Sequence, residues 1–485
     1  MTNFKSITKI LIFKFRHLNI WILTFGFITF ALFFSAKAAS AATYYVATNG
    51  SDANPGTITQ PFRTIVKSNS VLQPGDTLYI RGGTYDEGFN IAQAKSGTAS
   101  QSVTIAGYPG ETALVYSFPL CFYNCAGASA GASYIVLDNL IFDGQRYGTS
   151  GAYFGYGGNT FAPHHITLKN STVRNHWGGQ GIQVAGSYHT FSNLKVHDIG
   201  KDTFDHGFYI DRADHVTVEN SEIYNIKSAG IKFGETAMNY GIARNNIIHD
   251  FGLGQEATSA STQGGGTGFS ISIGATNIII YNNIIYNNKS PATCNNCPGI
   301  QLWKGDRNKV YNNVVYNMGP HQGIMVSHMT NVDVTNNIVT ESTPNFKNEG
   351  FGGTWTLGNN LCDVSGPGCS IVGYPKFINP AGNDFHLQST SPAINAGATL
   401  SEVTTDFDGI LRPQGSGYDI GAYEYVGSPP AGASADLNSD GRVNSVDAAI
   451  LMGAWGQTTK PKADINQDGA VNSVDASLMM GQWSP

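Results

Sequence analysis

Short stretches of alternating apolar and polar residues recur through the middle of the chain and predict short β-strands. Six of them share the pattern Gly-apolar-x-apolar and begin at Gly181, Gly207, Gly230, Gly268, Gly299 and Gly323. Because successive side chains of a strand point to opposite faces, the two apolar residues would be buried and the residue between them would point outward. Each stretch precedes a second one, in which alternating apolar residues end at an asparagine such as Asn220.

The recurring asparagine defines a repeat. It occupies positions Asn139, Asn170, Asn193, Asn220, Asn245, Asn282, Asn312 and Asn336, which are 31, 23, 27, 25, 37, 30 and 24 residues apart. A third short strand follows each asparagine, as at Ile223. Three short strands in a repeat of about 25 residues are typical of one coil of a parallel β-helix, an all-β fold. We expect the asparagines to stack at a turn as a structural ladder.

Stacked coils would place the outward residues of the first strand in one row: Gln183, Tyr209, Lys232, Ser270, Gln301 and Met325. The long connections 251–267 and 289–298 would wall this row, and long loops on a rigid scaffold usually carry function. The sequence therefore predicts a groove with Lys232 at its centre and Asp202, Asp205 and His206 at its edge. The expected substrate-binding residues are Tyr209, Asp211, Arg212, Gln301, Trp303 and Lys304.

Two twelve-residue loops near the C-terminus predict calcium binding. Calcium takes six to eight oxygen ligands, supplied by loop positions 1, 3, 5, 7, 9 and 12, with glycine at position 6 for the turn. The first loop offers Asp436, Asn438, Asp440, Arg442 (through its backbone carbonyl), Asn444 and Asp447. The second offers Asp464, Asn466, Asp468, Ala470 (through its backbone carbonyl), Asn472 and Asp475. We expect one calcium ion in each loop.

A duplicated loop with aspartate at position 12, each copy followed by a short apolar helix, resembles a type I dockerin. The resemblance implies a small α-helical, EF-hand-like module that docks onto a cohesin-type module. It places partner contacts at Ser445-Val446 and Ser473-Val474, and this identity would allow two docking orientations. The helices lack the Lys/Arg pairs that are frequent in cellulosomal dockerins. The partner is therefore an unusual cohesin, or the module is only a calcium-stabilised end.

Composition and the N-terminus bear on location. Charged residues make up 13% of the chain, 58 residues are glycine, and the net charge of −6 excludes a basic surface for nucleic acid. A basic start, an apolar stretch at 20–34 and Ala39-Ser-Ala41 predict a signal peptide over 1–42, with an uncleaved membrane anchor as the alternative. We expect a β-helix domain over 43–426, a flexible linker over 427–435 and the dockerin over 436–485. The protein would be a secreted or surface-tethered monomer.

Export permits disulfide bonds. The six cysteines form three local couples and predict the bonds Cys121–Cys125, Cys294–Cys297 and Cys362–Cys369, although six cysteines allow fifteen pairings. A redox or zinc site at the Cys294-x-x-Cys297 couple is less favoured, because no second Cys or His pair stands at metal-ligand spacing.

Both ends of the repeat region resemble segments of known proteins. Residues 43–56 and the stretch 74–85 resemble the entry segment of secreted right-handed β-helix proteins, including polysaccharide lyases. Residues 375–425 resemble a closing segment of bacterial β-helix proteins. We expect these segments to cap the two ends, because an uncovered solenoid end exposes unpaired strand edges.

The stretch Asp205-His-Gly-Phe-Tyr and the stretch Gly230-Ile-Lys-Phe-Gly look like polysaccharide lyase family nine. There an Asp-Asp-Gly-Trp-Asp segment binds calcium and the lysine of Gly-Phe-Lys-Leu-Gly is the base. Carried across, Asp205 matches the first calcium aspartate and Lys232 matches the base, while His206 and Tyr209 replace the other two aspartates. Another ion arrangement, another substrate or a lost activity would each fit this departure.

The leading hypothesis is a lyase that cleaves an acidic, uronate polysaccharide by β-elimination. Such enzymes abstract the proton α to a carboxylate, and they need a cation at that carboxylate and a base for the proton. Lys232, His206 and Asp205 are the catalytic candidates, and Asp202 is a candidate ligand for a further calcium ion in the groove. A non-catalytic glycan-binding or cell-surface protein is the first alternative, and a β-helix hydrolase or epimerase the second. Hydrolysis by paired aspartates is disfavoured because the chain has no Asp-Asp pair.

Overall fold

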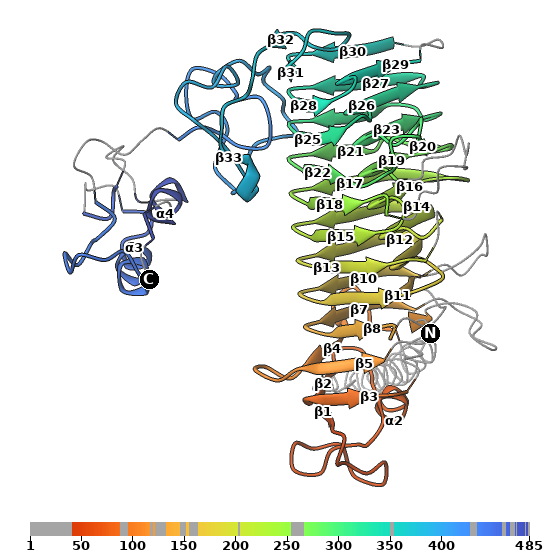
Figure 1. The fold of residues 1–485 in the computed structure, drawn as a ribbon. Helices are drawn as coiled ribbons and strands as arrows, with labels where there is room; N and C mark the ends of the chain where they lie inside the picture. The colour runs from red at the N-terminus through yellow and green to blue at the C-terminus, as the bar shows by residue number, and fades with distance from the viewer. Residues whose placement is uncertain are drawn as a thin grey trace, which may run out of the picture. The chain divides into compact units, whose positions relative to one another are not determined.

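A computed structural model of the chain describes residues 41–87, 96–116, 120–121, 132–145, 152–154, 163–201, 204–253, 266–349, 354–426, 434–457, 462–465, 471, 473–480 and 482–483. Parallel strands stack coil upon coil into a β-helix (Figure 1). Within the described ranges, β33 and β34 form the one antiparallel strand pair. The same ranges contain no helix with the length and apolar character needed to cross a membrane.

Three rows of strands run along the stack. The row that carries the predicted groove contains β6 (Leu120–Cys121), β9 (Ala152–Phe154), β16 (Ile231–Phe233), β19 (Phe269–Ile271), β23 (Ile300–Trp303), β26 (Ile324–Ser327) and β29 (Phe346–Asn348). The second row contains β1 (Thr43–Val46), β2 (Thr77–Ile80), β4 (Val103–Gly107), β7 (Ser133–Asp138), β10 (His164–Lys169), β17 (Met238–Arg244), β20 (Ala275–Thr276), β21 (Ile279–Tyr281), β24 (Asn308–Tyr311), β27 (Asn331–Thr335) and β30 (Thr354–Gly358).

The third row forms a separate sheet. It contains β3 (Gly83–Tyr85), β5 (Ala113–Tyr116), β8 (Ile141–Asp143), β11 (Thr172–His176), β13 (Lys195–Ile199), β15 (Glu222–Ile226), β18 (Ile247–Phe251), β22 (Ile284–Asn288), β25 (Val314–Gly319), β28 (Ile338–Ser342), β31 (Leu361–Cys362) and β32 (Ile371–Val372). The expectation of three short strands per coil is wrong for two coils. There the first two rows merge into the single long strands β12 (Ile182–Ser192) and β14 (Phe208–Glu219). The register between these two strands shifts between Val184 and Gly186, so a bulge turns the corner instead of a break.

Columns of apolar side chains fill the interior because equivalent residues of successive coils face each other. In the third row the column runs through Val173, Val196, Ile223, Ile248, Ile285, Val315 and Val339, all fully buried. The recurrent glycine before each first-row strand lies where two coils approach closely. A Cβ atom at Gly207 would stand 2.5 Å from the carbonyl oxygen of Gly230 and 2.9 Å from Ile223 Cγ2. Any larger residue there would push the coils apart.

The asparagine ladder lies one residue later than predicted. Asn245, Asn282, Asn312 and Asn336 do form a turn, each with a positive φ between 50° and 62°. The continuous ladder inside the coil is made by the asparagine that follows each of them, and it runs Asn246, Asn283, Asn313, Asn337 and Asn360. All five are fully buried, and each Nδ2 donates to the Oδ1 of the next at 2.9 to 3.0 Å. Asn-Asn doublets in the sequence carry this signal.

The closing segment does not cap the end of the stack as predicted, because residues 375–425 lie along its side. Phe385, Leu387 and Ile420 pack on the outward residues Val314 and Ile338 of the third row. Burial of this apolar strip stabilises the side position, because it removes apolar surface from water. The segment contains β33 (Phe377–Asn379), a 3-10 turn at Pro380–Gly382 and β34 (Asp384–Leu387).

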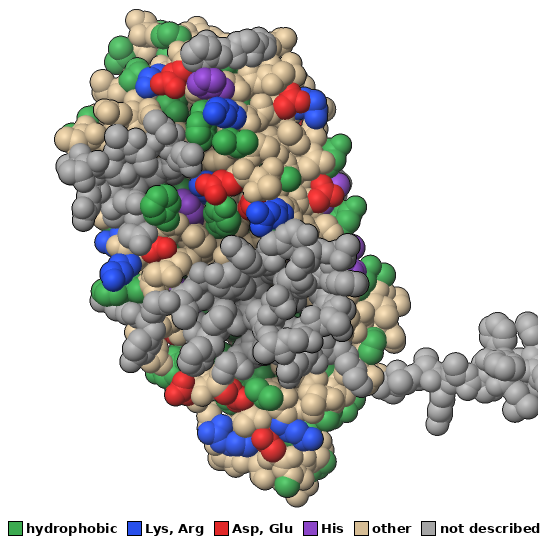
Figure 2. Space-filling model, turned by 90° about the vertical axis from the view of Figure 1, so that its right-hand side faces the viewer, with side chains coloured by type: hydrophobic (Ala, Val, Ile, Leu, Met, Phe, Trp, Pro, Cys, Tyr) green, Lys and Arg blue, Asp and Glu red, His purple; other side chains and the backbone are tan. Residues whose placement is uncertain are grey.

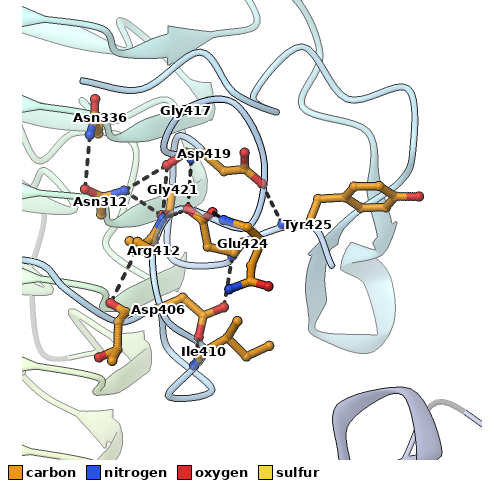
Figure 3. A network of polar contacts seen from close by, with 12 residues as sticks. Asn312, Asn336, Asp406, Ile410, Arg412, Gly417, Asp419, Gly421, Glu424 and Tyr425 are labelled. Atoms are coloured by element: carbon orange, nitrogen blue, oxygen red, sulfur yellow. Dashed lines mark hydrogen bonds and ion pairs between the residues drawn. The ribbon is translucent and has the colours of Figure 1, made fainter. Parts of the chain in front are cut away.

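A buried polar network fastens this segment to the coils (Figure 3). Arg412 Nη1 and Glu424 Oε1 form an ion pair at 2.6 Å, and both side chains are fully buried. Arg412 also donates to Asn282 Oδ1 at 3.3 Å. Asn312 Nδ2 donates to the carbonyl oxygen of Asp419 at 3.0 Å. The turn asparagines therefore serve as anchor points for a segment about a hundred residues further along the chain.

The remaining helices are short. Near the N-terminal end, α2 (Ile65–Asn69) begins after Thr64, whose side chain accepts a hydrogen bond from the Lys67 amide. In the C-terminal module, α3 (Ser445–Gly453) and α4 (Ser473–Met480) each follow one predicted calcium loop. Leu437, Val443, Leu451, Val471 and Leu478 form its small core.

The bonds Cys294–Cys297 and Cys362–Cys369 are present as predicted, whereas the predicted bond Cys121–Cys125 lies outside the described residues.

Candidate functional site

The predicted row of outward residues exists in register. Consecutive strand pairings align Gln183, Tyr209, Lys232, Ser270, Gln301 and Met325, and then Lys347 on β29. Ile231 and Phe233, the residues on either side of Lys232, belong to the core, so Lys232 points outward from the sheet. We call this set of side chains the polar face. Figure 2 views the side of the stack where β14, β16 and β19 are labelled in Figure 1, and basic and acidic side chains lie there in small mixed groups.

Lys232 is the cation at the centre of the polar face. It is only 4% exposed, although it points away from the core. A buried ammonium needs a partner, and Lys232 Nζ forms an ion pair with Glu235, three residues later in the turn after β16. The Nζ atom also lies 5.6 Å from the centroid of the Tyr209 ring on the neighbouring strand, within the range of a cation–π contact.

Tyr209 and His206 lie beside this lysine. The Tyr209 hydroxyl donates to Glu235 Oε2 at 2.8 Å. Burial and this carboxylate raise the pKa of Tyr209 well above its ordinary value, so the phenol keeps its proton. The His206 ring stacks on the Tyr209 ring with centroids 5.8 Å apart. Burial, together with the charge of Lys232, lowers the pKa of His206 well below its ordinary value. Its Nδ1 accepts the Ala229 amide at 3.1 Å, so the neutral ring carries its proton on Nε2.

The other expected substrate contacts fall into two groups. Asp211 is 8% exposed, and its Oδ1 accepts backbone amides of the turn that carries Glu235, with distances of 3.1 Å to Glu235 and 2.8 Å to Thr236. Asp211 thus shapes that turn. Arg212 is exposed beside it, with Nε 3.9 Å from Asp211 Oδ2.

The second group lies further along the row. Gln301 is 1% exposed and accepts the Ser270 hydroxyl at 3.3 Å. Trp303 is half-buried, and Lys304 Nζ lies over its ring at 4.6 Å from the centroid. The walls of the predicted groove are only partly described, since 254–265 lie outside the described residues.

The predicted groove calcium gains no ligand cluster from the described residues. Among them, no group of three or more His, Cys, Asp and Glu side chains could hold a metal ion. Asp205 is 5% exposed, and its Oδ2 accepts the Lys201 amide at 2.7 Å, which places it as a support for that loop. Asp202 lies outside the described residues.

The first predicted calcium loop has the donor chemistry that the ion needs. The Asn438 side chain donates through Nδ2 to Asp440 Oδ2 at 2.8 Å, and Asp436 Oδ1 accepts the backbone amide of Asp440 at 3.0 Å, so the Asp436 carboxylate lies against the loop backbone. Asp447 is buried, and the amides of Asn444, Asn438 and Leu437 lower the pKa of its carboxyl group. This mixed set of carboxylate and amide oxygens fits calcium. In the second loop Asp464 and Asp475 are described, while Asn466, Asp468, Ala470 and Asn472 lie outside the described residues.

Glu235 is the residue that sequence reasoning underrated. It lies outside every strand, so the repeat pattern gives it no position in the row. Its oxygens nevertheless meet both Lys232 and Tyr209. A carboxylate three residues after a lysine that points outward was the available signal.

Comparisons with known proteins agree with this architecture. Residues 44–173 match the family model described as Pel9A-like, right handed beta helix region. Residues 126–290 and 180–366 match the model of a right handed beta helix region, and residues 434–482 match the dockerin type I domain. The predicted right-handed parallel β-helix and the dockerin are thereby confirmed.

Curated relatives match only in part. Pectate lyase PEL9 of Emericella nidulans is 41% identical over 78 residues, which are 16% of this chain and 19% of that protein. The uncharacterized protein YwoF of Bacillus subtilis is 38% identical over 71 residues, 15% of each chain. The chain thus spans less than a fifth of the length of either relative. The crystal structure of pectate lyase Pel9A has a TM-score of 0.52 and 18% identity, and the match covers 80% of this chain and 97% of that one. At this identity the likeness shows the fold.

Proposed function

Because this chain is a pectate-lyase-like right-handed β-helix protein with a type I dockerin domain, we propose that it is a secreted polysaccharide lyase. It cleaves an acidic, uronate-containing polysaccharide by β-elimination. The partial match to a fungal pectate lyase supports this reaction class. The dockerin tethers the enzyme to a cohesin-type module, with partner contacts at Ser445-Val446 and Ser473-Val474.

The observation that carries the proposal is the buried lysine at the centre of the polar face. Lys232 stands on β16 with an aromatic ring on the adjoining coil, and the sequence resemblance to polysaccharide lyase family nine aligns it with the base of that family. In the proposed reaction Lys232 takes the proton from C5 of a uronate, and the bond from C4 to the glycosidic oxygen breaks. Lys304 and Arg212 offer further positive charge for substrate carboxylates, and Trp303 offers a ring face for a sugar.

The proposal also includes calcium binding by the two loops of the dockerin. One ion in each loop would be held by the six predicted positions, Asp436 to Asp447 in the first and Asp464 to Asp475 in the second. When bound, calcium cross-links the loop oxygens and so stabilises the helices that would face a cohesin. Capping of α3 begins within the same loop, because Asn444 and Asp447 form a capping box at its N-terminus.

Glycan binding without cleavage is the second candidate function. The ion pair between Lys232 and Glu235 favours it, because a lysine that holds a carboxylate is not free to take a proton. Cleavage requires that this pair opens when substrate enters, whereas binding does not.

Ultraviolet absorbance of an unsaturated uronyl product decides between the two. The full mature chain is incubated with pectate, alginate and glycosaminoglycans, with calcium and with chelator, beside Lys232→Ala. The matched control is Lys195→Ala, an exposed lysine that pairs with Glu222 on the third row. We expect product from the parent chain and from Lys195→Ala, and none from Lys232→Ala. Binding of a polyuronate with no product from the parent chain would select glycan binding instead.

A further inference from the structure

A second pair of lysine and glutamate stands on the polar face, at a distance from Lys232 along the stack. Direct strand pairing links the outward residues of successive coils in the order Lys232, Ser270, Gln301, Met325 and Lys347. Four strand spacings of about 4.8 Å therefore place the two lysine positions about 19 Å apart. Lys347 Nζ forms an ion pair with Glu349 Oε1 at 2.6 Å, and it lies 3.5 Å from Asn296 Oδ1 in the connection 289–298.

The two pairs share one arrangement of donors around a carboxylate. Glu235 meets the Lys232 ammonium with one oxygen and accepts a phenol hydroxyl with the other. Glu349 meets Lys347 with Oε1, and its Oε2 accepts the Ser327 hydroxyl at 3.1 Å. The hydrogen bond from Lys347, together with that from Ser327, outweighs burial and lowers the pKa of Glu349. Lys347 and Ser327 are thus already placed to hold a carboxylate.

The neighbours of this second pair suit an acidic sugar. Trp303 on β23 is the direct strand partner of Ser327 on β26, so an aromatic ring lies next to the hydroxyl that Glu349 accepts. Lys304 is exposed beside Trp303. Lys304 and Lys347 together outweigh the single charge of Glu349, and an aromatic ring can pack on the apolar face of a pyranose. We call Trp303, Lys304, Ser327, Lys347 and Glu349 the distal cluster.

We propose that the distal cluster is a second subsite for a uronate of the polysaccharide, and that Glu349 fills this subsite while no polysaccharide is bound. The inference rests on the proposed binding of an acidic polysaccharide along the polar face. On binding, a sugar carboxylate replaces that of Glu349 at Lys347 and Ser327, and the sugar ring packs on Trp303. Neither donor loses its partner, because one carboxylate takes the place of another. His328 Nδ1, 2.6 Å from Ser327 Oγ, keeps the hydroxyl in place.

The distance to Lys232 decides how long a glycan must be to fill both places. A pyranose advances an extended glycan by roughly one strand spacing. A glycan that runs along the stack with one uronate at Lys232 therefore reaches the level of Trp303 after about two further sugars and that of Lys347 after about four. A uronate hexamer is long enough to contact both.

Calorimetric titration with uronate hexamers tests the subsite. The full chain carries Lys232→Ala, so that no hexamer is consumed, and receives hexamers of galacturonate, mannuronate or guluronate. Adding Lys347→Met should weaken binding about tenfold, a usual contribution of a hydrogen bond to a charged group. The carboxyl-reduced hexamer should bind equally with and without Lys347→Met, and an equal loss for both hexamers would refute carboxylate recognition.

Lys309→Met is the matched control. The Lys309 side chain is 36% exposed against 33% for Lys347, and it also forms an ion pair with a glutamate, Glu402. It lies on β24 in the second row, outside the polar face. Hexamer binding should therefore stay unchanged in Lys309→Met, and a loss equal to that of Lys347→Met would reduce the effect to one of overall charge.

Glu349→Gln tests whether Glu349 fills the subsite at rest. Removal of its charge should tighten hexamer binding about twofold to fivefold, the range that a partly exposed ion pair supports. Unchanged or weaker binding would overturn this part of the inference, and weaker binding would make Glu349 a substrate contact.

The outcomes also separate this inference from the proposed function. Unsaturated product from the parent chain, with hexamer binding unaffected by Lys347→Met, would overturn the subsite and leave the lyase standing. Weaker binding in Lys347→Met, with no product from the parent chain, would leave the subsite standing and overturn cleavage. Failure of all three hexamers to bind would overturn the subsite.

Discussion

Asn283 and Asn313 stack amide on amide inside the coil, with Nδ2 of the first donating to Oδ1 of the second at 2.9 Å. Asn313 Oδ1 also accepts the backbone amide of Asn283 at 2.9 Å, and its own Nδ2 donates to the Ile280 carbonyl at 3.0 Å. Asn313→Ala removes the side-chain acceptor of the buried Asn283 backbone amide and interrupts the ladder, although Asn283 Nδ2 keeps its bonds to the carbonyl oxygens of Ala243 and Tyr281. We expect a loss of about 2–4 kcal/mol in the free energy of unfolding, measured by denaturant titration. The exposed Asn295→Ala should change it by less than about 0.5 kcal/mol, and equal losses would contradict a special role for the ladder.

The ion pair between Arg412 and Glu424 should decide whether the closing segment stays on the side of the stack. Arg412→Met leaves the Glu424 carboxylate buried and uncompensated, which costs about 3–5 kcal/mol. Hydrogen exchange of residues 375–425 should therefore speed up while the coils before Asn282 keep their protection. The control is Arg307→Met, whose ion pair with Asp306 is exposed and contributes less than about 1 kcal/mol. Unchanged exchange in Arg412→Met would show that the apolar strip alone holds the segment.

The same segment should make stability depend on pH through His386. Burial alone would lower the pKa of His386, but Asp408 and Asp384, at 2.8 and 2.6 Å from its two ring nitrogens, outweigh burial and raise the pKa to about 9. A raised histidine pKa stabilises the fold fully below the unfolded pKa of about 6.5 and stops doing so as pH rises through about 9. The difference in thermal midpoint between the parent chain and His386→Gln should shrink over this window. A difference that stays constant to alkaline pH would contradict the charge-based account.

The first dockerin loop should account for one of two calcium ions. Asp440→Ala removes the carboxylate at loop position 5, which contacts the Asn438 side chain, so calorimetric titration of the full chain should fall from two ions to one. The exposed Gln457→Ala, beyond the end of α3, should still bind two. Two ions in Asp440→Ala, at unchanged affinity, would show that this loop is not a calcium site.

Sequence reasoning reached furthest where structure repeats locally. The Gly-apolar-x-apolar pattern predicted which side chains face the core, and stacking the repeats predicted the row from Gln183 to Met325 in the correct register. This works because each coil pairs with its neighbours one repeat away, so spacing along the chain translates directly into position along the stack. The same logic indicated both described disulfide bonds, whose cysteines are close in sequence.

The sequence by itself thus determined the β-helix, the dockerin and the position of the lysine at the centre of the polar face. Only the tertiary structure decided what surrounds that lysine and where the closing segment lies. Glu235 meets Lys232 in the turn after β16. The Asp211 carboxylate holds this turn in place by accepting the backbone amides of Glu235 and Thr236. Residues 375–425 bind the side of the stack through contacts with residues more than a hundred positions away, such as Asn312. The repeat spacing does not predict such contacts. They depend on which polar groups and apolar residues of the assembled coils are left without partners from neighbouring coils.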